Sequence, residues 1–180
     1  MAKTISLKNI TQSFLERPIL TGISLKITEG QKLCIVGENG AGKSTLLKII
    51  SGTLLPTSGN IERNGHIRTY YVPQEFSKEN LAKKLADYIK DYAGATLTPK
   101  VFRFGKILGF NLEKVIEKEC HELSGGQQKI LALSVGLATE PDFLLLDEPE
   151  NHLDIVSRKE LMELLGSYKG GVLFVSHDRT

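Results

Sequence analysis

The chain of 180 residues is predicted to adopt an α/β fold, with an N-terminal antiparallel β region and an inserted helical lobe. Three observations predict it. A glycine-rich stretch, residues 37–44, lies between an apolar run and a helical pattern. A second apolar run, residues 143–146, ends in two acids, at the kind of strand end where α/β sheets bind ligands. From about residue 78 to 122 the pattern becomes that of charged, amphipathic helices.

The N-terminal region, residues 4–27, is predicted to be a small β meander. Residues 4–9 and 23–27 alternate between apolar and polar side chains, as strands with one solvated face do. Arg17-Pro18 is expected to break the chain between these strands.

Residues 32–36 form a short apolar run, which is predicted to be a buried strand with Cys34 as a small core residue. Two more strands are expected at residues 60–63 and 67–72. Asn64-Gly65 lies between these two runs, and this dipeptide is a strong signal for a hairpin that would pair them.

The inserted lobe, about residues 78–122, is predicted to be helical. Apolar side chains recur at helical spacing from Leu81 to Ile89, and Thr98-Pro99 suits a helix start. The many charges of the lobe are more typical of a solvated face than of a binding patch. After the lobe, helices are expected at residues 125–139 and 155–165, and strands at residues 143–146 and 172–175.

The composition and charge indicate which partners and which cellular compartment are expected. The net charge of +2 is too small to indicate a nucleic-acid or membrane partner. The two cysteines, Cys34 and Cys120, form no metal-spaced pair and require no oxidising compartment. There is neither a signal peptide nor an apolar run long enough to span a bilayer, so a cytoplasmic protein without membrane insertion is expected.

The stretch Gly37–Ser44 has the spacing of a phosphate-binding loop: glycine, four residues, then Gly-Lys-Ser. Its glycines let successive backbone N–H groups point at phosphate oxygens, and the following helix adds the positive end of its dipole. Lys43 can reach the β- and γ-phosphates, and the Ser44 hydroxyl can ligate Mg²⁺. The alternative is a glycine-rich turn before a helix. The predicted nucleotide-binding residues here are Gly37, Glu38, Asn39, Gly40, Ala41, Gly42, Lys43, Ser44 and Thr45.

Asp147 and Glu148 directly follow the apolar run at residues 143–146. In a parallel sheet this position places them at the carboxyl edge, beside the phosphate loop. Asp147 would then hold Mg²⁺ directly or through water, and Glu148 would polarise the attacking water. An acidic turn after a core strand is the alternative interpretation.

Leu123-Ser124-Gly125-Gly126-Gln127 is the most diagnostic stretch. A serine and paired glycines that open a helix make a second anion site, whereas a plain N-cap would explain the serine but not both glycines and the glutamine. The stretch resembles the signature of the ATP-binding cassette (ABC) family, and the phosphate loop, the signature and the acidic strand occur in that family's order. The resemblance covers essentially the whole chain. It implies a P-loop NTPase core, with residues 1–180 as a single nucleotide-binding domain.

The resemblance also implies roles for single residues. Phe14 matches the aromatic residue that stacks on adenine, with a core aromatic as the alternative. Gln74 matches the glutamine that senses Mg²⁺ and links the core to the helical lobe, with a surface glutamine as the alternative. Asp154 matches the loop that crosses to a partner cassette, and it can also cap the next helix. His177 matches the histidine that contacts the γ-phosphate. The residues predicted to have no chemical role are His152, Tyr70, Tyr71 and Tyr88.

Cassettes of this family work in pairs, and the resemblance implies the same here. The phosphate loop of one cassette faces the Leu123–Gln127 segment of the other, with ATP between them. Lys43, Mg²⁺, His177 and the partner's signature helix would stabilise the charge on the γ-phosphate, and Glu148 would orient water. The partner would be a second copy or a tandem cassette. An isolated monomer is expected to bind ATP but to hydrolyse it poorly.

Several biological roles stay open. Asn151–Asp154 and Ser176–Arg179 resemble the soluble ABC-F branch, which acts on the ribosome. The roughly fifty residues between Gln74 and Leu123 leave no room for the long helical arm of that branch, and Glu150 replaces its usual threonine. The competing role is the nucleotide-binding subunit of a transporter, peripheral on the cytosolic face beside a membrane permease. A third is a truncated cassette that only binds nucleotide, since the chain stops just past the last predicted strand and the C-terminal end of the fold is expected to be missing.

Overall fold

The fold is that of a computed structural model, which describes residues 2–176. The contacts within the chain divide it into two compact units. The first unit runs up to Tyr71 and also contains Pro141–Glu148 and the residues from Tyr168 onward. The second unit contains Val72–Glu140 and Pro149–Ser167. The phosphate loop and the acidic strand therefore belong to the first unit, and the signature stretch belongs to the second.

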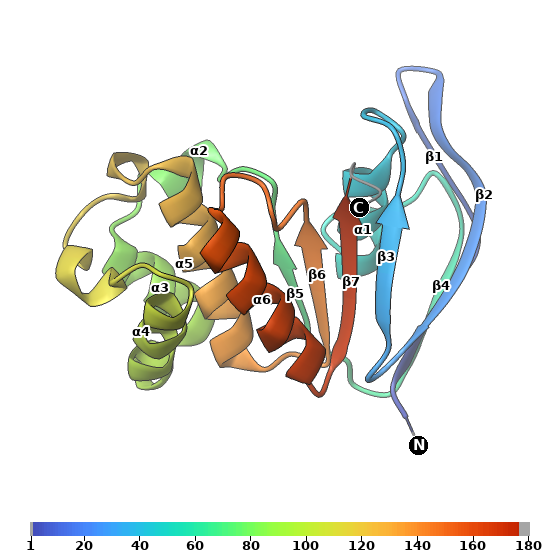
Figure 1. Cartoon of the computed structure of the whole chain (residues 1–180). Coiled ribbons are helices and arrows are strands. Elements are labelled where there is room, and N and C mark those ends of the chain that lie inside the picture. The colour runs from blue at the N-terminus through green and yellow to red at the C-terminus, as the bar shows by residue number, and fades with distance from the viewer. Residues whose placement is uncertain (1, 177–180) are drawn as a thin grey trace. The chain divides into compact units, whose positions relative to one another are not determined.

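The antiparallel sheet of the first unit has the order β2–β1–β4 (Figure 1). The predicted break at Arg17-Pro18 is wrong, because the chain turns at Leu15 and Glu16, whose φ angles are 46° and 65°. Pro18 continues β2 opposite Ser13, and a proline is tolerated there because β2 is an edge strand. The three strands are β1 (Thr4–Phe14), β2 (Arg17–Thr28) and β4 (Ser58–Asn64).

The second sheet of the first unit has the order β3–β7–β6–β5, and β7 pairs in parallel with both β3 and β6. The predicted hairpin across Asn64-Gly65 is wrong, because the strands on either side of this dipeptide lie in different sheets. Every position of β6 is buried, as its continuous apolar run predicts. The four strands are β3 (Lys32–Val36), β5 (Thr69–Val72), β6 (Phe143–Asp147) and β7 (Gly171–Ser176).

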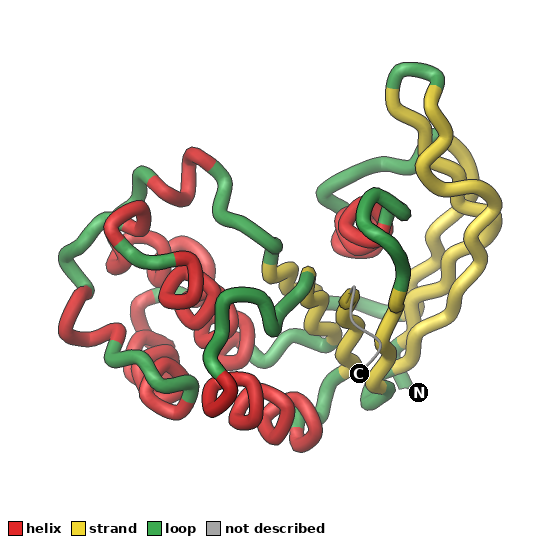
Figure 2. Tube along the Cα trace, turned by 45° about the horizontal axis from the view of Figure 1, so that its top comes forward, coloured by secondary structure: helices red, strands yellow, loops and turns green. Residues whose placement is uncertain are grey.

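Helix α1 (Lys43–Ser51) lies between the two sheets of the first unit (Figures 1 and 2). Its apolar side chains, among them Leu47 and Ile50, join a core that includes Ile5 of β1 and Val175 of β7. Both ends of the helix are set by glycines in the left-handed conformation, one before its first residue and one after its last. The core thus fixes the helix, and the helix fixes the end of the phosphate loop.

Strand β3 is less buried than predicted, and Cys34 is exposed rather than a core residue. Leu33 and Ile35 pack against the core of the first unit, whereas Lys32, Cys34 and Val36 alternate with them and are exposed. Only the face of β3 that bears Leu33 and Ile35 contributes to the core, and the opposite face is exposed. The apolar run predicted the strand correctly but not the burial of its two faces.

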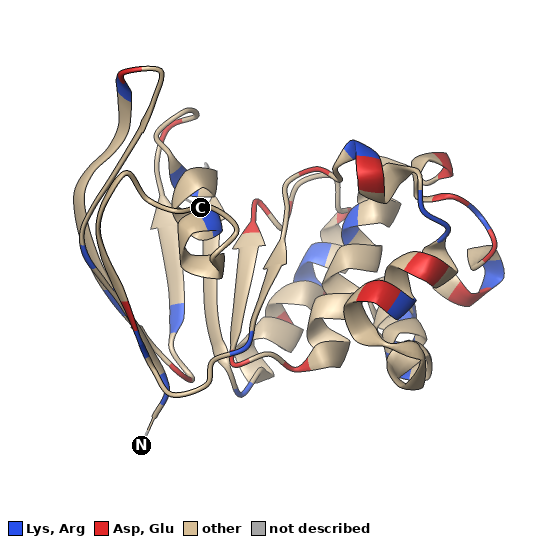
Figure 3. Ribbon diagram, turned by 180° about the vertical axis from the view of Figure 1, so that it is seen from behind, with Lys and Arg blue, Asp and Glu red and all other residues tan. Residues whose placement is uncertain are grey.

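The second unit is helical, and its longest helix, α5, packs against α3 and α4. Acidic and basic positions are mixed along the helices of this unit (Figure 3). Exposed ion pairs such as Lys106–Glu113 agree with the predicted solvated face. Within residues 2–176, none of the helices has both the length and the apolar character to cross a membrane. The α-helices are α2 (Lys78–Leu81), α3 (Leu85–Ala93), α4 (Thr98–Ile107), α5 (Gly125–Thr139) and α6 (Ile155–Ser167). Short 3-10 helices lie at Ala95–Leu97, Leu112–Val115 and Cys120–Glu122.

Candidate functional site

The predicted phosphate loop, Gly37–Ser44, leads from β3 into α1. Gly42 has a φ of 87°, and a Cβ at this position would lie 2.8 Å from side-chain atoms of both Ile19 and Leu20. Glycine is therefore required here for its backbone conformation and for the lack of space. The first turn of α1 contains no acidic residue, so no carboxylate of that turn weakens the positive end of the helix dipole.

Lys43 is the first residue of α1, and its side chain turns back into the loop. Its ammonium donates hydrogen bonds to the carbonyl oxygens of Gly37, at 2.7 Å, and of Glu38, at 2.9 Å. The residue is only 9% exposed. A buried positive charge within a loop of backbone amides is an arrangement that favours phosphate.

Asp147 ends β6 and is 1% exposed. The hydroxyl of Ser44 donates to its Oδ1 at 3.0 Å, so the acid lies beside the phosphate loop, as the sequence predicts. The hydroxyl of Tyr71 donates to its Oδ2 at 2.8 Å. Burial, and then the charge of Asp147, raise the pKa of Tyr71 above its ordinary value, so this hydroxyl stays protonated and keeps donating.

Tyr71 is thus more than the packing residue that the sequence predicts. It is half-buried against the core of the first unit, but its hydroxyl also orients the carboxylate of Asp147. A signal for this role was present in the sequence, because Tyr71 comes near the end of a predicted strand, where functional side chains gather.

Glu148 follows Asp147 in a strained conformation. Its φ is 46°, a left-handed value that is rare for a residue with a side chain. The residue is 7% exposed, and its N–H donates to the carbonyl of Val175 at 3.1 Å. Local strain of this kind is common at active sites, where the surrounding structure holds it in place.

Ser44 and Asp147 present a hydroxyl and a carboxylate 3.0 Å apart, and oxygen donors of these types suit Mg²⁺. In the described part of the chain, no group of three or more His, Cys, Asp or Glu side chains could hold a metal ion by itself. Mg²⁺ commonly takes one or two protein oxygens and completes its shell with phosphate oxygens and water. The pair therefore fits a cation that arrives with a nucleotide.

The signature stretch forms the start of α5 in the second unit. The Ser124 hydroxyl accepts a hydrogen bond from the Gln127 N–H at 3.3 Å, and the Gln127 side chain accepts one from the Ser124 N–H at 3.1 Å. This reciprocal pair is a capping box. A cap therefore does account for the glutamine, contrary to the prediction from the sequence, because Gln127 is the second half of the cap. Ser124 and Gly125 are exposed, whereas Leu123 is buried.

The two glycines of the signature allow another segment of the second unit to lie close to the start of α5. His152 has a φ of 65°, and its carbonyl oxygen lies where a Cβ on Gly126 would overlap it. Its imidazole would lie 3.6 Å from a Cβ on Gly125. The sequence predicts no role for His152, but its contacts pack its loop against the start of α5. No local pattern in the sequence signals this contact, because it joins distant segments.

The remaining predicted site residues are distributed as follows. Phe14, at the end of β1, is 46% exposed, so the core-aromatic alternative is wrong. Gln74 is exposed and lines a pocket in the second unit. Asp154 caps α6, because its Oδ1 accepts the Ser157 N–H at 2.7 Å, and this hydrogen bond lowers the pKa of the acid. His177 lies outside the described residues.

Comparisons with known proteins agree with this geometry. The sequence model of the ABC transporter family matches residues 20–151. YdiF of Bacillus subtilis (strain 168) is 39% identical over 181 residues, which cover 98% of this chain but only 28% of YdiF. The zinc import ATP-binding protein ZnuC of Vibrio vulnificus (strain YJ016) is 34% identical over 182 residues, covering 99% of this chain and 69% of ZnuC.

Among solved structures, a bacterial Atm1-family ABC exporter with ATP bound matches the fold with a TM-score of 0.84. The match covers 98% of this chain and 35% of the exporter chain, at 20% sequence identity. The family model covers most of the chain, and the order of the phosphate loop, signature and acidic strand is that of the family. The chain therefore belongs to the ABC transporter family of ATP-binding cassettes, a family of enzymes that hydrolyse ATP.

Proposed function

We propose that this chain binds Mg-ATP through its phosphate loop and hydrolyses it when paired with a second cassette. One observation in the first unit carries the proposal. The Lys43 ammonium is held inside the loop, and the Ser44 hydroxyl bonds to the buried carboxylate of Asp147 next to it. A cation, a hydroxyl and a carboxylate at the start of a helix are the groups that hold the phosphates and the metal of a nucleotide.

The proposed binding roles follow from this arrangement. The backbone amides of Gly37–Ala41 and of the first turn of α1 would hold the phosphates, and Lys43 would contact the β- and γ-phosphates. Ser44 and Asp147 would hold Mg²⁺, which neutralises phosphate charge when it is bound. Phe14, exposed at the end of β1, would stack on the adenine.

Hydrolysis would take place beside the carboxyl edge of β6. Glu148 would accept a hydrogen bond from the attacking water and orient it toward the γ-phosphate, so that ADP and phosphate form. The strained backbone of Glu148 supports this role, since it fixes the direction of the side chain. His177 would contact the same phosphate.

The second unit would supply the contacts to the partner's nucleotide. Ser124 and Gly125 are exposed at the start of α5, where N–H groups and the helix dipole favour a γ-phosphate. Asp154 would contact the partner cassette, and Gln74 would respond to Mg²⁺. Residues 1–180 would then act as one nucleotide-binding domain, and the partner would be a second copy or a tandem cassette.

A Glu148→Gln variant tests this proposal. We expect its ATP turnover to fall by about a hundredfold or more, which is the usual contribution of a positioned base, while ATP binding is retained. With ATP, the variant should form a dimer that size-exclusion chromatography with light scattering detects. Glu163→Gln, which alters an exposed acid of α6, is the control and should behave as the wild type does. Wild-type turnover in the Glu148→Gln variant would contradict the proposal.

For the biological role, we propose an ABC-F-like protein that acts on the ribosome. The Asn151–Asp154 segment supports it, because its residues resemble the loop of that branch. If this role is correct, the Glu148→Gln variant should sediment with ribosomes in the presence of ATP and remain in the supernatant with ADP. Equal sedimentation with both nucleotides would contradict a nucleotide-dependent ribosomal role.

The second candidate role is the ATPase subunit of a membrane transporter, peripheral on the cytosolic face. The observation in its favour is the 34% identity to ZnuC, of which this chain spans 69%. In this case the chain should co-purify with a membrane permease after detergent extraction, and it should not associate with ribosomes.

A further inference from the structure

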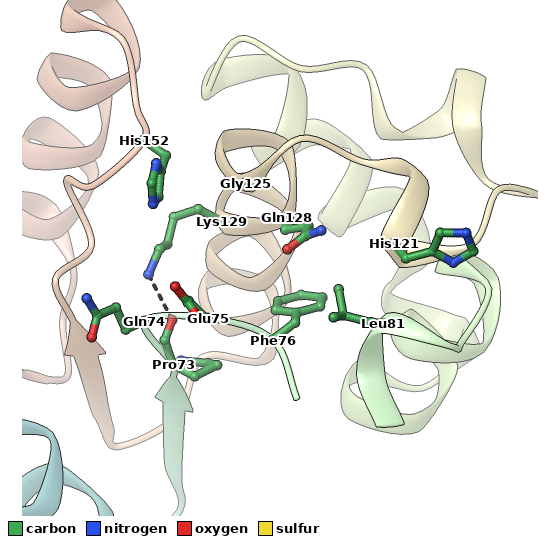
Figure 4. A pocket seen from close by; sticks show the side chains of 10 residues that line it. All are labelled: Pro73, Gln74, Glu75, Phe76, Leu81, His121, Gly125, Gln128, Lys129 and His152. Carbon is green, nitrogen blue, oxygen red and sulfur yellow. Dashed lines mark hydrogen bonds between the residues drawn. The ribbon is translucent and has the colours of Figure 1, made fainter. Parts of the chain in front are cut away.

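The second unit contains a pocket of about 290 Å³ beside the start of α5 (Figure 4). Its lining includes three segments of the second unit, namely the Pro73–Phe76 loop, the first turns of α5 and the loop that contains His152, together with Leu81 and His121. The resemblance to the family assigns roles to Gln74 and to the signature stretch, but it assigns none to His152 or to Lys129, which also lines this pocket.

Lys129 joins the first two segments. It is a residue of α5 that is only 3% exposed, and its ammonium donates to the carbonyl oxygen of Pro73 at 2.8 Å. In Figure 4 the side chain extends from α5 toward the segment that begins at Pro73. A buried ammonium must be hydrogen-bonded, so the Lys129 side chain strongly favours the position in which it contacts the Pro73 carbonyl. Because Pro73 directly precedes Gln74, the contact fixes where the Gln74 loop begins.

His152 joins the third segment to the same helix start. Its carbonyl oxygen occupies the space that a Cβ on Gly126 would need, and its ring lies against Gly125. In Figure 4 the imidazole is drawn above the Lys129 side chain, and it comes from a different segment of the unit. The loop that leads to Asp154 therefore rests directly on the signature residues.

We infer that Lys129 and His152 are positioning residues that hold the Gln74 loop and the Asp154 loop on the start of α5. Neither side chain needs to touch ATP for this role. The inference rests on the proposed function for its effect on turnover, because the three joined segments are those proposed to contact the nucleotide and the partner cassette. Small displacements of such groups lower the rate of reaction far more than the affinity for substrate.

Hydrogen exchange measured by mass spectrometry tests the contacts without any need for catalysis. Lys129→Met should raise amide exchange about tenfold in residues 74–76, because the loop loses its anchor. Lys129→Arg should restore most of the protection, and His152→Ala should raise exchange in residues 124–127. The phosphate loop, residues 37–44, should not change in any variant. Lys114→Met, at an exposed lysine of the same unit, is the matched control.

Steady-state kinetics test the consequence. We expect Lys129→Met and His152→Ala to lower kcat by about tenfold with KM within about twofold, and Lys129→Arg to recover at least half of the rate. If exchange near Gln74 and the signature is the same as in the wild type, or changes equally in Lys114→Met, the inference is wrong. A wild-type chain without turnover would contradict the proposed function instead, and the exchange data would still decide the positioning role.

Discussion

At the scale of single residues, Asp147 shows how a buried carboxylate is stabilised at the edge of a parallel sheet. Two hydroxyl groups, those of Ser44 and Tyr71, donate to its two oxygens from different elements of the first unit. Desolvation of a charge is costly unless hydrogen bonds replace those of water. Each of these donors therefore stabilises the fold as well as the proposed site.

Tyr71→Phe removes one of these donors and should destabilise the protein by about 1–2 kcal/mol, because one oxygen of a buried carboxylate loses a hydrogen bond. Urea denaturation followed by circular dichroism measures the change. Tyr92→Phe is the control, since the Tyr92 hydroxyl is bonded to Asn80 at an exposed position and its loss should cost less than about 0.5 kcal/mol. Equal losses in the two variants would show that Tyr71 acts through packing alone.

Asp142 should make the stability depend on pH. Burial opposes its ionisation, but hydrogen bonds from the Arg68 N–H and the Lys3 ammonium outweigh that effect and lower the pKa below the ordinary value of 3.8. A lowered pKa in the folded state stabilises the protein above the ordinary pKa, and this contribution is lost as the pH falls through the folded value.

Asp142→Asn should therefore be less stable than the wild type by about 1–2 kcal/mol at pH 7, and the difference should shrink below about pH 4. Urea denaturation across this pH range measures it. Glu62→Gln, which breaks the exposed pair with Lys8, is the control and should have little effect at any pH. A difference that stays constant down to pH 2 would mean that the charge of Asp142 is not the cause.

At the scale of elements, the start of α5 has a structural reason for most of its signature residues. Ser124 and Gln127 form the capping box, and Gly126 accepts the carbonyl of His152. Ser124 and Gly125 are also exposed at the helix start, where the proposed partner nucleotide would bind. Structure and proposed function therefore constrain this stretch together.

Gly126→Ala should destabilise the protein by about 1–3 kcal/mol, because the added methyl group overlaps a backbone oxygen that cannot rotate away. Gly125→Ala is the matched control: its methyl group would lie at an ordinary 3.6 Å from the His152 ring, and the helix should tolerate it. Thermal unfolding of both variants measures the difference. An equally tolerated Gly126→Ala would mean that the His152 loop does not rest on α5.

The helices and strands show most clearly which features of the fold the sequence predicts. Local patterns predicted α5 and β6 well, because periodicity and continuous apolar runs report burial directly. The same patterns misjudged what each strand pairs with. Asn64-Gly65 is a good hairpin signal, but the flanking strands join different sheets. Cys34 is exposed because it alternates with Leu33 and Ile35, which occupy the face of β3 that packs against the core. Strand pairing and the covering of each face are set by distant segments of the chain.

In the candidate site, too, residues within local motifs were predicted and residues that act through long-range contacts were not. Lys43, Ser44 and Asp147 were predicted because their motifs carry phosphate chemistry. In the first unit the Lys43 ammonium bonds to a carbonyl of the phosphate loop, and the Ser44 hydroxyl bonds to Asp147. His152 and Lys129 were not predicted. Their contacts join residues far apart in the sequence. Lys129 lies outside every motif recognised in the sequence, and His152, although it lies within Asn151–Asp154, was predicted to have no chemical role.

At the scale of the whole molecule, the two units carry complementary halves of the proposed site. The first unit holds the phosphate loop and the acids of β6, and the second holds the signature stretch and Asp154. In a pair of cassettes, the first unit of one chain would bind ATP that the second unit of the other chain completes. Hydrolysis should therefore depend on the encounter of two chains.

Turnover per molecule should fall with dilution. Below the dimer dissociation constant, a tenfold dilution should lower it by about tenfold, because the fraction of paired chains falls in proportion to concentration. ATPase assays over several decades of protein concentration, at saturating Mg-ATP, measure this dependence. Turnover per molecule that is independent of concentration, in a chain that stays monomeric, would show that one chain is sufficient.

Isothermal titration calorimetry of the wild type and a Lys43→Ala variant tests most directly whether the phosphate loop binds Mg-ATP. Loss of the ammonium should weaken binding by about ten- to a hundredfold, since hydrogen bonds to charged groups contribute about 1.5–3 kcal/mol. Lys48→Ala, at an exposed lysine of the same helix, should bind as the wild type does. Equal affinity in the wild type and Lys43→Ala would contradict a nucleotide site at this loop.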